Sequence, residues 1–389
     1  MKKLLSLLAI SVSLFSCVKE NNTSVSDNFN RTLVLTNWVY NLAIPAFEDF
    51  NEKIALLEEK SNAFISSPDG ATQGELQIAL FNAQKSWQHV AMFELQGTTR
   101  IYMNTYPIDR ETSTEPFNNS NEDDTTLAGN LAGTVADINA INFVTTSGTI
   151  DEQGFAALDY LINNENALTQ FTEPSSSDAH KAYLSKVVDR MVGLADNANT
   201  YWTTNASSII QNSGRSATAS FDLMLNDYTN YIEQGFRENK IATPSGKRDN
   251  IKNAKAVESY YSSEHSKELF EEAFKAVQNF YDGTSYDGTS TGAGLKTYLD
   301  YLNATAYVSE ENKDINISKL VENKFTEIET AANDLDADFV PYIESLEGVT
   351  PATKMFTVFN EIHDYVLLLK NQIFPAINVI QDYQDSDGD

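Results

Sequence analysis

Apolar side chains recur every three or four positions along most of this 389-residue chain, and this spacing constrains the fold more than any other feature. Between residues 72 and 98, for example, they fall at Leu76, Leu80, Ala83, Trp87 and Val90. Such spacing gathers apolar side chains on one face of an α-helix, which can be buried against other helices. Because no segment shows the strict alternation of a half-buried strand bounded by turn residues, we predict an all-α protein.

The same periodicity sets the expected order of helices. Long helices are predicted at 29–66, 72–98, 177–211, 217–240, 266–281, 313–332 and 351–374, with shorter ones near 127–142, 151–163 and 293–304. Pro45 and Pro375 fall within or at the end of predicted helices, and each is expected to kink or end its helix. The polar break Asn212-Ser213-Gly214 lies near the middle of the chain. We therefore predict two helical-bundle domains of similar size, at 29–212 and 213–389.

The N-terminus resembles a bacterial lipoprotein signal. Lys2 and Lys3 precede an apolar run, Leu4 to Phe15, that is shorter than the roughly 20 residues needed to cross a bilayer, so residues 1–16 are predicted to be a signal peptide. The run ends in Leu14-Phe15-Ser16-Cys17, which resembles a lipobox, and Cys17 is the only cysteine of the chain. An ordinary secretory signal with an incidental cysteine is the alternative.

If Cys17 is acylated, the protein is anchored to a lipid bilayer, and the polar residues 17–28 are predicted to be a flexible tether. The expected location is the cell envelope of a Gram-negative-type bacterium, on the outer membrane, facing either the periplasm or the exterior. With its only cysteine acylated, the protein would have no disulfide and no thiolate metal site.

The formal net charge of −28 narrows the possible partners. A nucleic-acid-binding surface needs lysine and arginine to neutralise phosphates, so nucleic acid is excluded as a partner. A field of this sign attracts cationic ligands, or it serves only to keep the protein soluble.

Histidine and carboxylate pairs are few. The four histidines are His89, His180, His265 and His363. His265 and Glu268 form a His-x-x-Glu match, which is either a ligand pair or the exposed first turn of a helix behind a serine cap. The terminal Asp385-Ser386-Asp387-Gly388-Asp389 alternates acids as a calcium loop does, but no bidentate glutamate follows, and a solvated tail is the alternative.

Several short segments, taken in order, resemble the imelysin-like family over roughly residues 32–389. They are Val34-Leu35-Thr36-Asn37, Ile44-Pro45-Ala46-Phe47, Asp49-Phe50, Ala83-Gln84-Lys85-Ser86-Trp87, Tyr106-Pro107, Asp151-Glu152-Gln153-Gly154-Phe155, Ala157-Leu158-Asp159-Tyr160-Leu161, Pro244-Ser245-Gly246, Val257-Glu258-Ser259-Tyr260-Tyr261-Ser262 and the terminal Asp-Ser-Asp-Gly-Asp. The resemblance implies two helical bundles with a cleft between them, an envelope location and a role in bacterial iron or haem uptake.

The family's hallmark is Gly-x-His-x-x-Glu on a helix, and this chain departs from it. Gly154 is kept, Ala156 stands at the histidine position and Asp159 at the glutamate position. Positions 156 and 159 share one helix face, so histidine and glutamate there could share an ion. Alanine has no ligand atom, and a lone carboxylate cannot form a three-ligand zinc site, so no tight zinc site is expected. Asp159 is either a remaining metal ligand or part of a buried helix with the core face Phe155, Leu158, Leu161 and Ile162.

We therefore expect a non-catalytic binding or accessory lipoprotein in iron or haem uptake, with iron or haem as its ligand and uptake proteins as its partners. The alternatives are a metal-dependent peptidase of the imelysin type and a metal-independent envelope module that binds a protein or peptide. If the two bundles enclose a cleft, its candidate lining residues are Trp87, His89 and Glu94.

Overall fold

The computed structural model describes residues 27–97, 99–109, 126–144, 147–248, 250–309, 311–347 and 353–382. The predicted signal peptide, Cys17 and the acidic end Asp385–Asp389 lie outside these residues. Among the helices in the described part of the chain, none is both long and apolar enough to cross a membrane.

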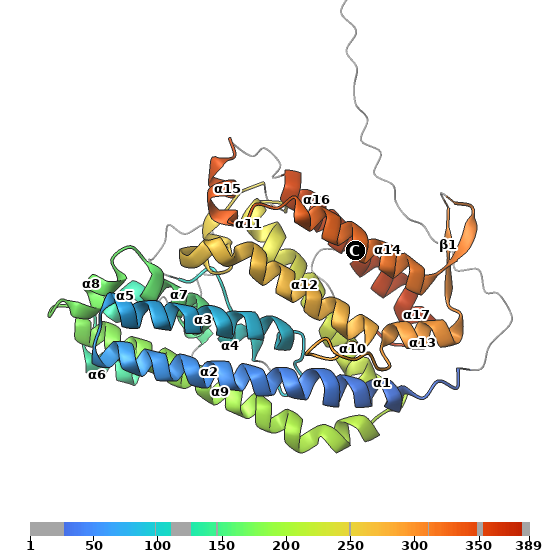
Figure 1. The fold of residues 1–389 in the computed structure, drawn as a ribbon, viewed down its shortest axis with the longest axis horizontal. Coiled ribbons are helices and arrows are strands. Elements are labelled where there is room, and N and C mark those ends of the chain that lie inside the picture. Colours follow the sequence, from blue (N-terminus) through green and yellow to red (C-terminus); the bar gives the residue numbers. More distant parts are fainter. Residues whose placement is uncertain are drawn as a thin grey trace, which may run out of the picture.

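Three long helices dominate the N-terminal part of the molecule: α2 (Ile44–Ser66), α3 (Gly70–Val90) and α9 (Ser177–Gln211). Helix α2 packs along both α3 and α9 (Figure 1), and α7 (Gly154–Asn163) packs on α3 and α9. The remaining short helices here are α4 (Arg100–Met103), α5 (Leu127–Leu131), α6 (Val135–Ala140) and α8 (Ala167–Thr172), with a 3₁₀ turn at Ser147–Glu152.

The C-terminal part is built on α10 (Ser220–Asn230), α12 (Ser266–Asp282), α14 (Ile317–Asn333) and α16 (Thr353–Leu368). Helix α14 packs on α16, whereas α12 packs on α3 and so joins the two parts (Figure 1). The shorter helices are α11 (Thr243–Ser245), α13 (Leu295–Leu302), α15 (Phe339–Ser345) and α17 (Phe374–Ala376), with 3₁₀ turns at Ala254–Ala256 and Tyr260–His265. The all-α prediction is confirmed, and in the part of the chain that the structure describes the exception is a small antiparallel hairpin, β1 (Thr305–Val308) with β2 (Lys313–Asn316), which the sequence did not indicate.

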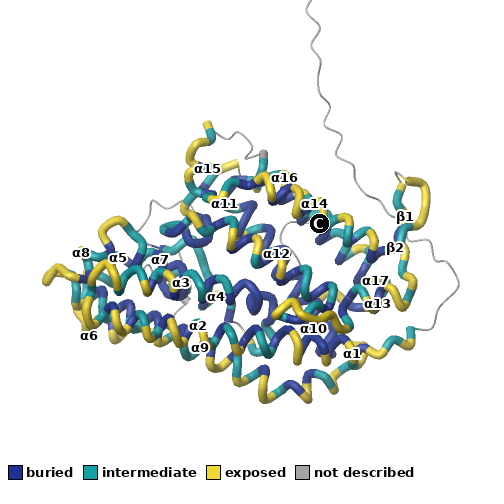
Figure 2. Tube along the Cα trace, viewed as in Figure 1, coloured by how far each residue is buried: buried dark blue, intermediate teal, exposed yellow. Residues whose placement is uncertain are grey.

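The buried apolar side chains form one continuous core, which runs from Val34 near the start of the described chain to Val379 near its end. Buried positions lie along the helices of both parts (Figure 2). The predicted boundary near residue 212 falls in the link between α9 and α10. The N-terminal and C-terminal parts nevertheless contribute to the same core, because α12 and its neighbours bury apolar side chains against α3.

Three long helices accommodate a proline by widening their turns. A π-helical segment precedes each proline: Trp38–Ala43 between α1 (Arg31–Asn37) and α2, Tyr231–Ala242 after α10, and Leu369–Ile373 after α16. In each case the residue just before the proline donates its backbone N–H to the carbonyl five positions earlier: Ile44 to Val39, Thr243 to Glu238, and Phe374 to Leu369. Pro45 and Pro375 were expected to kink or end their helices; the structure instead places a π-turn before each, and Pro244 behaves in the same way.

At Pro45 the missing hydrogen bond is replaced from another segment. Proline has no N–H for the carbonyl four positions before it, which here belongs to Asn41. That carbonyl accepts the backbone N–H of Tyr286 at 2.8 Å. The Tyr286 hydroxyl donates to Asp49 on α2 at 2.7 Å. The loop between α12 and α13 is thus attached to the first helix at its proline.

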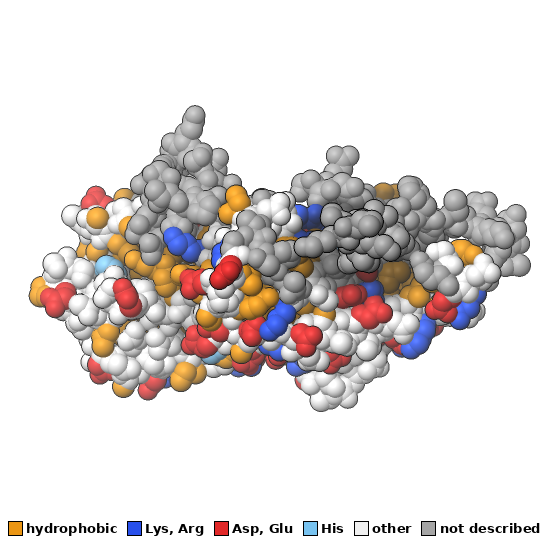
Figure 3. Space-filling model, turned by 90° about the horizontal axis from the view of Figure 1, so that it is seen from above, with side chains coloured by type: hydrophobic (Ala, Val, Ile, Leu, Met, Phe, Trp, Pro, Cys, Tyr) orange, Lys and Arg blue, Asp and Glu red, His pale blue; other side chains and the backbone are white. Residues whose placement is uncertain are grey.

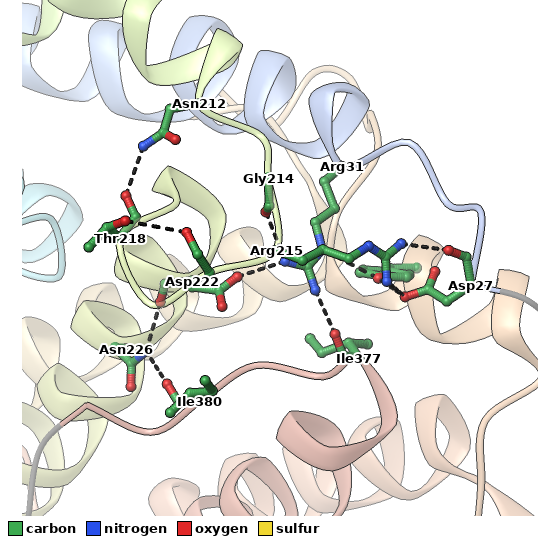
Figure 4. A network of polar contacts seen from close by, with 12 residues as sticks. Asp27, Arg31, Asn212, Gly214, Arg215, Thr218, Asp222, Asn226, Ile377 and Ile380 are labelled. Carbon is green, nitrogen blue, oxygen red and sulfur yellow. Dashed lines mark hydrogen bonds and ion pairs between the residues drawn. The ribbon is translucent and has the colours of Figure 1, made fainter.

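A buried guanidinium joins the two ends of the described chain (Figure 4). Arg31, 2% exposed, forms an ion pair of 2.7 Å with Asp222 on α10 and donates to the Ile377 carbonyl at 2.6 Å. It also donates to the Gly214 carbonyl and the Tyr298 hydroxyl, and we call these five residues the Arg31 network. Beside the network, in the last residues of the predicted tether, Asp27 is paired with Arg215.

Candidate functional site

Gly154 begins α7 at a point where only glycine fits. Its φ is +73°, in the left-handed region that favours glycine. A Cβ at this position would lie 2.4 Å from the carbonyl oxygen of Met103. The motif glycine therefore allows α7 to begin directly against the end of α4, and this contact fixes where the next two motif positions lie.

Ala156 and Asp159 line a small pocket. Ala156 is 8% exposed and Asp159 1% exposed. The other lining residues are Tyr106, Pro107, Ile108, Lys255, Val257, Ser259, Tyr260 and Tyr261. The pocket offers about 30 Å³ to water, room for one or two molecules. Because Phe155, Leu158, Leu161 and Ile162 are buried in the core, α7 packs through one face and presents the motif positions to the pocket.

Asp159 holds the 3₁₀ turn Tyr260–His265 against α7. Its Oδ1 accepts from the Ser262 hydroxyl at 2.6 Å and from Asn163 Nδ2 at 2.9 Å, and its Oδ2 accepts the backbone N–H of Tyr261 at 2.7 Å. We call these four residues the Asp159 centre. All three donors are neutral, and among the described residues no lysine or arginine is paired with this carboxylate.

Burial raises the pKa of Asp159 to about 6, from an ordinary value of 3.8. The three hydrogen bonds lower the pKa, and the nearby charge of Glu264 raises it slightly. The cost of burying the charge is therefore larger than the stabilisation that the neutral donors supply. Asp159 is ionised at neutral pH and becomes mainly protonated in mild acid.

The backbone just before the turn is strained. Ser259 has φ +59° although it is not glycine, and its side chain is 3% exposed. Gln84 on α3 supports it by donating from Nε2 to the Ser259 hydroxyl at 2.7 Å. Residues held in this way often belong to functional sites, because the surrounding contacts must compensate for the unfavourable conformation.

Next to the pocket, Glu258 is neutralised by a cation. It is ion-paired with Lys240, and both side chains are buried. Its Oε1 also accepts from Asn104 at 2.7 Å and from Gln88 at 3.1 Å. Every oxygen of this carboxylate is therefore used by the protein, and Glu258 is not available as a free ligand.

The three predicted cleft residues lie in different environments. Trp87 is 2% exposed and packs against Phe50 and Phe155 in the core. His89 contacts Glu272 on α12 at 2.9 Å and lines a separate, smaller pocket. Glu94 accepts the backbone N–H of Arg100 at 2.9 Å and so caps α4. The structure does not bring these residues together at the motif.

The residues at the motif do not fit a metal ion. Ala156 supplies no ligand atom, and both oxygens of Asp159 already accept hydrogen bonds. Within the described ranges, no group of three or more histidines, cysteines and acids lies close enough to hold an ion. His265 and Glu268 do not form a pair, since His265 stacks on Phe81 and Glu268 binds Lys85.

The sequence reasoning did not identify the partners of Asp159. Tyr261 and Ser262 lie more than a hundred positions after it, and only a family resemblance drew attention to their segment. The same is true of Tyr106, which lines the pocket from the other side. Helical periodicity could not have found these residues, because they belong to a turn and a loop.

Comparison with known proteins identifies the fold and the family of this chain. Two crystal structures share its fold at 14% sequence identity. A protein assigned as an iron-regulated protein A precursor from Parabacteroides distasonis ATCC 8503 matches with a TM-score of 0.64, over 89% of this chain and 94% of its own. An imelysin-like protein from Psychrobacter arcticum 273-4 matches with a TM-score of 0.61, over 91% and 97%. A search of curated proteins gives no match. The family model Imelysin matches residues 43–364, and the chain therefore belongs to the imelysin family.

Proposed function

We propose that this protein is a lipid-anchored, non-catalytic binding component of bacterial iron or haem uptake. The observation that carries the proposal is the state of the motif: Ala156 replaces the metal-ligating residue, and the oxygens of Asp159 are occupied by Tyr261, Ser262 and Asn163. A carboxylate used in this way holds a turn against a helix, and by itself it falls short of the three protein ligands of a catalytic zinc ion.

The link to iron comes from the relatives. One protein of the same fold is described as iron-regulated, and the family membership is consistent with an envelope protein. Cys17, in its lipobox-like setting, supplies the proposed anchor. The experiment for the anchor is metabolic lipid labelling of the wild type and of Cys17→Ser, and a labelled variant would rule the anchor out.

The proposed binding site is the pocket at Ala156. Tyrosine and aliphatic side chains form most of its walls, and Asp159 is the one acid among the described residues that line it. About 30 Å³ is far below the volume of a ligand pocket that encloses a drug-sized molecule, so haem would contact it only by an edge. The same walls favour the second candidate, a module that binds a peptide without any metal.

The test measures binding and hydrolysis on the full-length protein in detergent. We expect saturable binding of haemin by absorbance titration or of ferric nitrilotriacetate by calorimetry, weakened by Ala156→Leu, which fills the pocket. Ala71→Leu adds the same side chain at an exposed position of α3 and should leave binding unchanged. Insulin-chain cleavage that disappears with chelator and returns with zinc would overturn the non-catalytic assignment. Absence of binding of both iron probes would overturn the iron role.

A further inference from the structure

A second pocket lies between α3 and the 3₁₀ turn Tyr260–His265, next to the Asp159 centre. It measures about 380 Å³, enough to take up a long side chain. Gln84, Phe81 and Asn163 are among its lining residues on the helices, and Glu264 and His265 line it from the turn. We call it the α3 pocket.

One buried atom in the α3 pocket has no partner. The Gln84 side chain is 2% exposed, and its Nε2 donates to Ser259. Its Oε1 is also buried, and nothing in the described structure donates to it. Buried acceptors are almost always hydrogen-bonded, because an unpaired one loses its hydration without compensation. One residue of the pocket wall therefore carries a buried acceptor that lacks a donor.

The walls of the pocket suit a flat cation. The rings of Phe81 and His265 lie parallel, with 3.7 Å between centroids, and form an aromatic side. The carboxylate of Glu264 is exposed and adds a negative charge. Lys85 already stands 5.4 Å from the centre of the Phe81 ring, and its charge is balanced by Glu268 at 2.6 Å.

The net charge favours the same kind of ligand. The formal charge is −28, and on the face shown in Figure 3 acidic side chains are spread widely among the basic ones. Such a field concentrates cations and repels phosphates and other anions. A guanidinium combines a positive charge, a plane that stacks on aromatic rings, and several N–H donors in a rigid fork.

We propose that the α3 pocket binds a guanidinium group, with Gln84 turning its unpaired Oε1 toward the pocket to accept from it, Glu264 pairing with it, and the Phe81–His265 side lying along its plane. The group would be supplied by an arginine of a peptide or by a free alkylguanidine. This inference is independent of the iron role, because it uses neither Ala156 nor its pocket.

The test is calorimetry on the full-length protein in detergent with three probes: the peptide Gly-Arg-Gly, agmatine, and the citrulline peptide, which keeps the shape and loses the charge. Titrations are run at about 0.5 M NaCl, where the Debye length is about 4 Å and background binding to the acidic surface is screened. We expect one saturable site for a guanidinium probe and none for citrulline. Equal affinity for Gly-Arg-Gly and agmatine under these conditions would show that a small alkylguanidine is a sufficient ligand. Binding of Gly-Arg-Gly without binding of agmatine would show that the ligand is an arginine within a peptide.

Matched variants locate the site. Glu264→Gln should weaken binding about twofold, as expected for an exposed ion pair that is partly screened by this salt. Gln84→Met should weaken it at least about tenfold through loss of a hydrogen bond to a charged group. Glu311→Gln, an exposed acid in the turn of the β1–β2 hairpin that does not line the pocket, should change nothing. Thermal unfolding checks that Gln84→Met is folded. If Gln84→Met is not folded, the affinity of Glu264→Gln, a change at an exposed position, decides whether the proposal holds. Equal binding of citrulline, no saturable binding, or unchanged affinity in Glu264→Gln would overturn the proposal.

Discussion

The Asp159 centre and the Arg31 network both join segments that are far apart in the sequence, but they treat a buried acid differently. Asp222 meets a guanidinium at 2.7 Å, whereas Asp159 meets only neutral donors. Both acids are 1% exposed, so burial does not distinguish them. Burial raises the pKa of both acids, but at Asp222 the charge of Arg31 opposes the rise, whereas at Asp159 only neutral hydrogen bonds oppose it.

The largest expected effect tests the Arg31 network, in which the buried acid is paired with a cation. Arg31→Met removes the guanidinium and leaves Asp222 buried without its partner, which should lower the free energy of unfolding by about 3–5 kcal/mol. Chemical denaturation measures the loss. Arg215→Met is the matched control, because Arg215 lies beside the network but is 38% exposed, and its loss should cost at most about 1 kcal/mol. Equal losses in the two variants would contradict the distinction between them.

The next effect tests how the motif is positioned. Gly154→Ala places a Cβ 2.4 Å from the Met103 carbonyl at a φ of +73°. The overlap and the unfavourable backbone together should lower the free energy of unfolding by about 3 kcal/mol. The control is Gly193→Ala on α9, where an added Cβ meets nothing within 4 Å and should stabilise the helix slightly. A harmless Gly154→Ala would show that α7 is free to move away from α4.

A pH-dependent effect tests the Asp159 centre by itself. The folded protein raises the pKa of Asp159 to about 6, so it binds this proton more tightly than the unfolded chain does. The stabilisation from that proton is complete below the ordinary pKa near 4 and is lost as the pH rises through about 6. Asp159→Asn has no such titration. The substitution should therefore cost about 2 kcal/mol more at about pH 4.5 than at about pH 7.5.

The measurement is urea denaturation of wild type and variant at both pH values, since the difference between the two proteins cancels other titrating groups. Ser262→Ala serves as a second variant, because it removes one donor and should raise the pKa of Asp159 further. A cost of Asp159→Asn that is independent of pH would mean that burial and hydrogen bonding balance at this carboxylate.

Periodicity was sufficient for the long helices and insufficient for the site. The expected helix at 177–211 coincides with α9, because one apolar face over many turns has a single consistent interpretation. The expected helix at 72–98 ends at Val90, and Glu94 lies beyond this end, where it accepts from the first turn of α4. The π-turns at the prolines were anticipated only as kinks or ends. The hairpin β1–β2 is too short to give a pattern.

At the motif, too, the sequence predicts less than the structure shows. The sequence shows that Ala156 cannot ligate a metal, but not that Asp159 binds Ser262, because that contact spans 103 positions. Turn and loop residues such as Tyr106 and Tyr261 carry no periodic signal, so only the fold brings them to the pocket. The alternatives considered for Asp159, a ligand or part of a packed helix, omitted its observed role as an acceptor that holds a turn.

The smallest expected effect concerns metal affinity, and it tests whether the Asp159 centre is committed to holding the turn. Ala156→His restores the family histidine at a pocket-lining position, so an accessible imidazole would be present one turn from Asp159. We expect its zinc affinity to stay within about twofold of the wild type in calorimetry at high salt, where background binding is screened. The reason is that Tyr261 and Ser262 already occupy the carboxylate, and two ligands fall short of the three protein ligands typical of catalytic zinc. Adding Ser262→Ala to Ala156→His frees one acceptor position on Asp159. The matched comparison is therefore between the single variant Ala156→His and this double variant. A tight, salt-resistant zinc site in Ala156→His alone would show that the hydrogen bonds to Asp159 yield readily to a metal, and that the loss of the histidine alone separates this protein from a metal-binding relative.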